Sequence, residues 1–124
     1  MRRDMELVRQ LLLKIEAADR GLDLTDFTCD AWTNDEIAYH LRLLKSKGFI
    51  DGTEGKAWSG NIVMFHVDGL TWDGADFLDA IRDDRVFSKT SKVVRETVGS
   101  VTLDTFKDAA KIVALEAIKR GIGL

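Results

Sequence analysis

A capped helix that runs directly into a β-hairpin is the feature that most constrains the fold of this chain. Residues 33–36, Thr-Asn-Asp-Glu, have the pattern of a capping box, in which the two outer side chains bond to amides that the first turn leaves unpaired. Three apolar residues at helical spacing mark the inner face of the helix: Ile37, Leu41 and Leu44. Gly48 ends the run, and residues 51–60 have the glycine-rich composition of a hairpin tip. Residues 62–67 form the next strand, and its two mostly apolar faces predict that both are at least half covered.

The segments on either side of this unit are mainly helical. Apolar periodicity predicts a first helix over residues 4–18, whereas residues 22–32 favour a short strand and a loop. Thr71 can cap a helix that follows the hairpin. Two more helices are predicted, one over about residues 88–98 and one from the Thr102 cap to Gly121. The order of these elements is an α+β pattern.

Composition limits the class of protein. The chain has 124 residues, of which 45% are hydrophobic and 31% charged, so it can bury a core without a disulfide or a metal. Cys29 is the only cysteine, which fits a reducing cytoplasm. No apolar run approaches the roughly 20 residues that span a bilayer, and no signal peptide is recognisable. We therefore expect a soluble, unexported, cytoplasmic protein that does not associate with membranes.

Charge is distributed unevenly along the chain. Residues 51–84 carry two Lys/Arg and eight Asp/Glu, whereas residues 85–124 carry eight and four. The formal net charge of −3 excludes a strongly basic protein that coats nucleic acid without selection. The asymmetry favours either a partner surface or, more simply, solvated faces of opposite sign.

Residues 37–50, Ile-Ala-Tyr-His-Leu-Arg-Leu-Leu-Lys-Ser-Lys-Gly-Phe-Ile, resemble the recognition helix and first wing strand of winged helix-turn-helix proteins. Residues 70–74, Leu-Thr-Trp-Asp-Gly, are similar to the segment that follows the wing in many members. The resemblance implies a winged-helix-like core, made of a helix, a short strand, a helix, a β-hairpin wing and a helix. We expect this core over residues 1–86, with two C-terminal helices over residues 87–124 packed on the same domain. The stretch 22–32 departs from the pattern because it lacks the usual second helix.

A second resemblance extends over nearly the whole chain. The opening residues 2–9, the Tyr39-His40-Leu41 segment and the block 70–84 resemble a family of small bacterial and phage proteins known as domain of unknown function 2513. This likeness implies a fold and a mobile-element setting, and it implies no activity.

A winged-helix reading predicts a DNA-contacting surface. Outward residues of the helix and the hairpin would face bases and phosphates: Asn34, Tyr39, Arg42, Lys45 and Lys56. Asp35 and Glu36 oppose this reading because they repel phosphates. A module with so few cations would bind weakly as a monomer, so binding would need dimerisation or the basic C-terminal third. Arg42 and Lys45 could instead simply solvate the outside of a core helix.

A protein partner is the alternative. Trp58 lies in the expected hairpin tip and is either a partner contact or packed back onto Trp32 or the first helix, whereas Trp72 is expected in the core. On one helix, Asp76, Asp79 and Asp83 would share a face that could bind a cation or a basic partner. A solvated acidic face is the simpler account of the same three residues. The apolar stripe of the last helix could also form a homodimer seam.

Catalytic and metal-binding patterns are weak. His40 and His66 lack the spacing of a zinc motif, so hydrogen-bonded roles at the edge of the core are favoured. We predict no catalytic residues, no metal and no cofactor. The sequence therefore favours a small non-enzymatic DNA-binding regulator of a phage or mobile element, with a protein-interaction module, such as a phage accessory or anti-defence factor, as the alternative.

Overall fold

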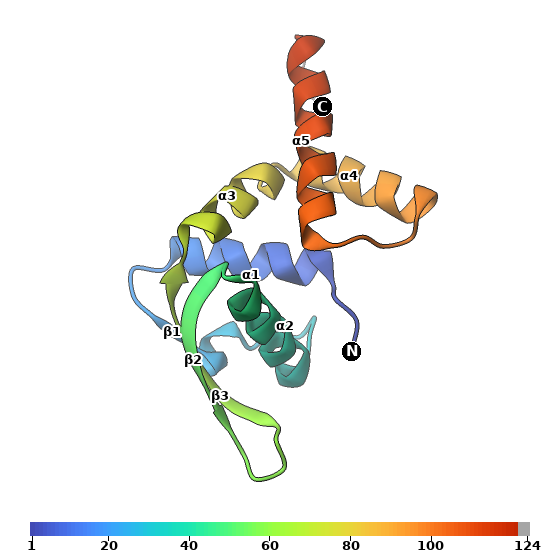
Figure 1. Ribbon diagram of the computed structural model, residues 1–124. Helices are drawn as coiled ribbons and strands as arrows, with labels where there is room; N and C mark the ends of the chain where they lie inside the picture. Colours follow the sequence, from blue (N-terminus) through green and yellow to red (C-terminus); the bar gives the residue numbers. More distant parts are fainter. Residues whose placement is uncertain (122–124) are drawn as a thin grey trace. The chain divides into compact units, whose positions relative to one another are not determined.

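The computed structural model describes residues 1–121, and the chain divides into two compact units. The N-terminal unit covers Met1–Asp76, and the C-terminal unit begins at Phe77. The described residues contain five α-helices, one short 3₁₀ helix and a three-stranded antiparallel sheet (Figure 1). The expected α+β order of helix, short strand, helix, hairpin and helix, followed by two C-terminal helices, is confirmed.

The N-terminal unit is built around a sheet in which β3 is the central strand. Its elements follow one another as α1 (Met5–Ala17), β1 (Leu22–Asp23), the 3₁₀ helix η1 (Leu24–Phe27), α2 (Asn34–Lys47), β2 (Ile50–Lys56) and β3 (Ile62–Leu70). The strand order is β1-β3-β2, and Leu22 pairs with Val67 while Ile50 pairs with Leu70. Helix α3 (Trp72–Ile81) starts in this unit.

Both helices that pack in this unit begin at side-chain caps. The Asp4 carboxylate accepts hydrogen bonds from the amides of Glu6 and Leu7 at the start of α1. Thr33 and Glu36 form the expected capping box at the start of α2, and Gly48 ends that helix with a φ of 80°, which glycine adopts without strain. The buried core residues of α1 and α2 include Leu7, Leu11, Leu12, Ile37, Leu41 and Leu44.

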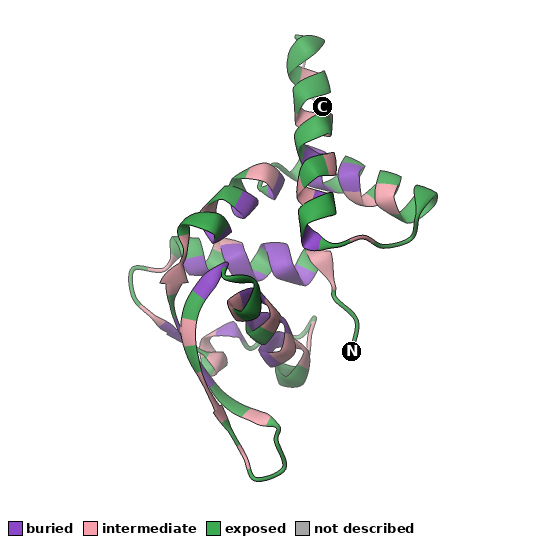
Figure 2. Cartoon of the chain, viewed as in Figure 1, coloured by how far each residue is buried: buried purple, intermediate pink, exposed green. Residues whose placement is uncertain are grey.

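The β2–β3 hairpin is covered only near its base, and its tip is coloured mainly as exposed (Figure 2). Phe65 and Val67 are buried, but Val63 is 63% exposed and Met64 is 56% exposed. Consecutive strand residues point to opposite faces, so both faces of the outer hairpin are bare. The expectation that strand 62–67 is at least half covered on both faces is therefore wrong for its first residues, because the strand begins beyond the edge of the core.

The first turn of α3 packs closely on Phe49, in the link between α2 and β2. The Thr71 amide donates to the Phe49 carbonyl over 3.0 Å, and the Thr71 hydroxyl accepts from the Gly74 amide, which confirms the predicted cap. A Cβ atom on Gly74 would lie 1.9 Å from the Phe49 carbonyl oxygen. Trp72 is about 200° away from Gly74 around the helix, which explains why it is 85% exposed. The expectation that Trp72 lies in the core is wrong.

The C-terminal unit contains a helical hairpin. Helix α4 (Asp84–Thr97) begins at an Asp83 cap, and α5 (Leu103–Lys119) begins at the predicted Thr102 cap. Phe87 of α4 and Phe106 of α5 pack with ring centroids 5.6 Å apart. Helix α4 starts four residues earlier than expected because the Asp83 carboxylate satisfies amides of its first turn.

Candidate nucleic-acid interface

Helix α2 has one buried face and one outward face. Ile37, Leu41 and Leu44 are completely buried, which fixes the rotation of the helix on the core. At 100° per residue the opposite side is occupied by Asp35, Tyr39, Arg42 and Ser46, which we call the outer face of α2. Arg42 is exposed and Tyr39 half-buried, so neither side chain is enclosed by the core.

The structure brings only some of the predicted DNA-contacting residues together. Tyr39 and Arg42 share the outer face of α2, and the half-buried Lys45 lies at its flank. Asn34 lies at the first turn, where its side-chain oxygen accepts from the Thr28 hydroxyl over 3.3 Å. Lys56 is exposed at the end of β2, in the hairpin beside α2 (Figure 1).

Charge changes sign along α2. The first turn carries Asp35 and Glu36, and the last turn carries Lys45 and Lys47. Carboxylates at a helix N-terminus offset its positive end, which removes the usual advantage of that end for binding phosphate. The C-terminal half of the outer face, around Arg42, is therefore the part of α2 that fits a polyanion.

The hairpin tip adds apolar surface to this region. Trp58 is fully exposed, and Val63 and Met64 are exposed on the two opposite faces of β3. We call these three exposed apolar residues the hairpin patch. The alternative that Trp58 packs back onto Trp32 or the first helix is wrong, because Trp58 is fully exposed. The Trp32 indole N–H donates to the Asp4 carboxylate over 3.0 Å. Exposed aromatic side chains are typical of contact surfaces.

The three aspartates expected on one face have different positions. Asp76 and Asp79 are exposed in α3, and Asp79 forms an ion pair with Arg82 at 2.7 Å. Asp83 lies outside α3, because that helix ends at Ile81. Hydrogen bonds from the amides of Val86 and Arg85 lower the pKa of Asp83. The expectation of a single face shared by all three residues is therefore wrong, since Asp83 caps the next helix.

His40 is a buried structural residue. It is 1% exposed, its Nε2 accepts from the Asp4 amide over 2.8 Å, and its Nδ1 lies 2.7 Å from the Glu36 carbonyl oxygen. Only the neutral tautomer with the proton on Nδ1 satisfies both contacts. The ring therefore joins the start of α1 to the first turns of α2, as expected for a hydrogen-bonded histidine at the core.

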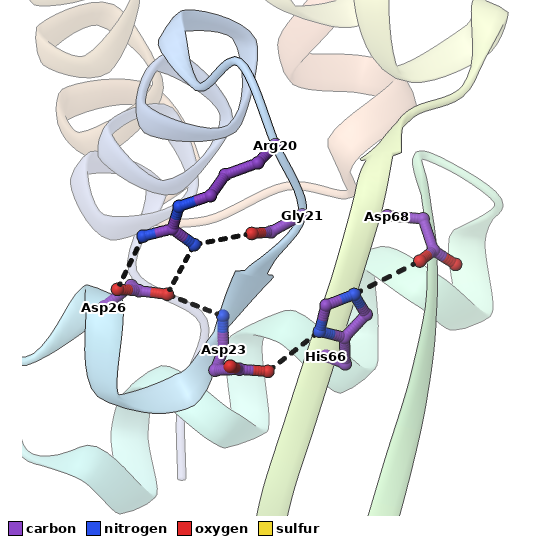
Figure 3. A network of polar contacts seen from close by, with 6 residues as sticks. All are labelled: Arg20, Gly21, Asp23, Asp26, His66 and Asp68. Carbon is purple, nitrogen blue, oxygen red and sulfur yellow. Dashed lines mark hydrogen bonds and ion pairs between the residues drawn. The ribbon is translucent and has the colours of Figure 1, made fainter.

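His66 belongs to an exposed polar network on the sheet (Figure 3). Its Nδ1 is 2.8 Å from Asp23 and its Nε2 is 3.4 Å from Asp68. The hydrogen bond to Asp23 and the charges of both carboxylates raise the pKa of His66, against a smaller opposing effect of desolvation. The network links β1 to β3.

Arg20 extends this network toward η1. Its guanidinium bonds to Asp26 at 3.3 Å and to the Gly21 carbonyl at 2.7 Å (Figure 3). The hydrogen bond from Arg20, followed by that from the Asp23 amide, lowers the pKa of Asp26. These contacts hold the loop after α1 against η1.

Among residues 1–121, no cluster of three or more potential metal ligands is present. Cys29 is a free, exposed thiol. In the same part of the chain no helix has the length and apolarity required to cross a membrane.

The basic C-terminal third of the sequence contains a cationic surface on α4. Four exposed cations share one side of this helix: Arg85, Lys89, Lys92 and Arg95. Their spacing was visible in the sequence, but placing the helix start at Ser88 left Arg85 outside it. The last helix, α5, exposes Ile112, Leu115 and Ile118, so a homodimer seam there remains a prediction.

Comparison with known sequences places the chain in a family. The sequence pattern of the family described as hypothetical protein (DUF2513) matches residues 2–100. The chain belongs to the DUF2513 family. A Haemophilus influenzae protein described as an uncharacterised protein is 33% identical to this DUF2513 chain over 123 residues, covering 97% of the chain and 98% of that protein. No solved structure matches the chain.

Proposed function

We propose that the N-terminal unit is a winged-helix-like module that binds double-stranded DNA, and that the protein is a non-enzymatic regulator. The observation that carries this proposal is the outer face of α2. That face belongs to a helix held by a fully buried ridge, presents Tyr39 and Arg42 to solvent, and leads directly into an exposed hairpin. A helix of this kind fits the major groove, and a hairpin beside it fits the adjacent backbone.

The topology supports the same proposal. The passage from α2 into the β2–β3 hairpin and then into α3 fits the order of elements that the winged-helix resemblance implies. The four-residue η1 lies where a second full helix would be expected. The helix pair therefore differs from the usual motif, and α2 with its hairpin is the part that supports DNA binding. A phage or mobile-element setting is what the family resemblance implies for such a regulator.

Selection from a random-sequence duplex library, followed by gel retardation, tests the proposal. We expect the full chain to enrich a defined sequence, and we expect Arg42→Ala with Lys45→Ala to lower affinity for that sequence about tenfold to a hundredfold, since a base contact contributes about 1–3 kcal/mol. The matched control is Lys111→Ala with Lys119→Ala, which removes two exposed cations from α5. Failure to enrich any sequence, or equal losses in both double variants, would contradict the proposal.

The hairpin patch favours a second candidate function, which is binding to another protein. Trp58, Val63 and Met64 offer apolar area, and Lys56 is the only cation between Asp51 and Ile81. Protein interfaces are rich in exposed aromatic anchors and poor in lysine. Affinity capture from lysate with wild type and Trp58→Ala distinguishes this function: a partner retained by the first and lost by the second supports it, whereas identical sets of captured proteins count against it.

A further inference from the structure

The C-terminal unit presents a cationic surface that the outer face of α2 does not include. Arg85, Lys89, Lys92 and Arg95 recur at intervals of four, three and three residues, which places them within about 120° of one another around the helix. All four side chains are exposed. We call this surface the cationic face of α4.

Most of these cations lack an internal counter-ion. Arg85 lies 3.5 Å from the Asp83 carboxylate. Within residues 1–121, Lys89, Lys92 and Arg95 have no ion-pair partner. Glu96 lies on the same side of the helix without pairing with them, so the face keeps a net positive charge. Unpaired cations gathered on one rigid element are the electrostatic pattern of a polyanion contact.

We propose that the cationic face of α4 binds the phosphate backbone of double-stranded DNA. The proposal rests on the DNA-binding function proposed above and adds a contact outside the N-terminal unit. From Arg85 to Arg95 the helix rises about 15 Å, and one strand of B-DNA presents a phosphate about every 3.4 Å of axis. The face therefore lies over about four phosphates. It supplies the non-specific attraction that the N-terminal unit lacks, because residues 1–76 carry nine Lys/Arg against fourteen Asp/Glu.

The other side of α4 argues against a membrane surface as the ligand. Val86 and Phe87 are buried, and Phe87 packs on Phe106 of α5. A helix that lies in a membrane interface needs a free apolar face to insert beside its cationic one. Because α4 uses its apolar side to hold α5, its cations are suited to a ligand bound by charge alone.

The experiment measures how the affinity of the full chain for a random-sequence duplex of about 30 base pairs depends on salt, by fluorescence anisotropy from about 50 to about 200 mM salt. We compare wild type with Lys89→Gln/Lys92→Gln and with the control Lys111→Gln/Lys119→Gln. Both pairs remove two exposed lysines from the same unit. Circular dichroism checks that each variant keeps its helices.

We expect the α4 variant to bind more weakly and to reduce the slope of log K against log salt by about two, since each neutralised phosphate contributes about 0.9. The control should leave both quantities unchanged. An unchanged slope in the α4 variant, an equal reduction in the control, or no binding of the duplex by wild type would overturn the proposal. Binding to phosphatidylserine vesicles that depends on Lys89 and Lys92, without duplex binding, would also overturn it.

Failure of this inference is distinguishable from failure of the proposed function. The α4 face is tested by salt-dependent binding to random sequence, whereas the outer face of α2 is tested by enrichment of a defined sequence. A chain that binds random duplex through Lys89 and Lys92 but selects no sequence retains the α4 contact and loses the α2 proposal. A chain that enriches a defined sequence but whose salt dependence is unchanged by the Lys89 and Lys92 substitutions retains the α2 proposal and loses the α4 contact.

Discussion

The backbone amide of Asp4 donates a hydrogen bond to Nε2 of His40, 36 positions further along the chain. The same aspartate caps α1 and accepts the indole N–H of Trp32. The residue that starts α1 is therefore connected to α2 and to the loop before it. The helix that carries the proposed DNA contacts is held in position partly through this one residue.

We expect His40→Phe to destabilise the fold by about 1–3 kcal/mol, because the substitution keeps a ring in place but leaves the Asp4 amide and the Glu36 carbonyl without their partner. Urea unfolding monitored by circular dichroism measures the change. The matched control is His66→Phe, at a half-exposed ring on the sheet. Losses of the same size at both positions would contradict a special role for His40.

Gly74→Ala should destabilise the chain by at least about 1 kcal/mol, although Gly→Ala usually stabilises a helix. The new Cβ would meet the Phe49 carbonyl oxygen at 1.9 Å, so the first turn of α3 would have to move away from Phe49. Gly69→Ala is the control, because no atom lies within 4 Å of the position of its Cβ. Thermal unfolding compares the two variants, and a raised melting temperature in Gly74→Ala would disprove the close approach.

Removing the cap of α2 should cost about 1 kcal/mol. Thr33→Ala loses the side-chain oxygen that accepts from the Glu36 amide over 3.1 Å. Thr33→Ser keeps that oxygen and should stay near wild type in a denaturant titration. If the two variants unfold at the same denaturant concentration, the capping box does not stabilise α2.

The polar network around His66 should make the folded chain more stable at low pH than at high pH. Since the pKa of His66 is raised above 6.5, its charged ring stabilises the folded chain below that pH, and this stabilisation is lost as the pH rises through the raised value. Asp23→Asn should lower the pKa of His66 more than Asp68→Asn does, because the hydrogen bond to Asp23 is the larger cause. Titration of the ring protons by NMR measures both shifts.

Stability gives a second readout of the same network. The difference in melting temperature between wild type and Asp23→Asn should shrink as the pH is raised from about 5 to about 9. A difference that grows over this range would mean that the sign is wrong. The control is the same substitution in a chain whose residue 66 cannot titrate: the difference between His66→Gln and His66→Gln/Asp23→Asn should show no such trend.

The elements that the sequence predicted well are specified by neighbouring residues. Helix α2 needs only Thr33, Glu36 and Gly48 for its ends and an apolar ridge for its face, and all of these lie within sixteen positions. Its outer face, with Tyr39 and Arg42, follows from the same periodicity. The part of the candidate site that lies on α2 was therefore predictable.

The features that were missed depend on contacts between distant segments. Trp72 is exposed because Gly74 turns the opposite side of α3 toward Phe49, and nothing near Trp72 in the sequence indicates that approach. Val63 is exposed because the hairpin continues beyond the core, and strand composition does not show where a core ends. Asp83 was placed on the wrong helix because the break between α3 and α4 is only two residues long.

The hairpin tip lies outside the core, which affects how readily its sequence can change during evolution. A register shift separates Gly55 from Lys56, at the point where the hairpin leaves its covered base. The regular pairing of the buried strand residues therefore ends before the tip. Substitutions at the exposed residues Trp58, Ser59 and Asn61 should cost little stability, whereas Gly60, with a φ of 86°, favours glycine. New binding preferences could evolve at those three positions while the folded scaffold stays intact.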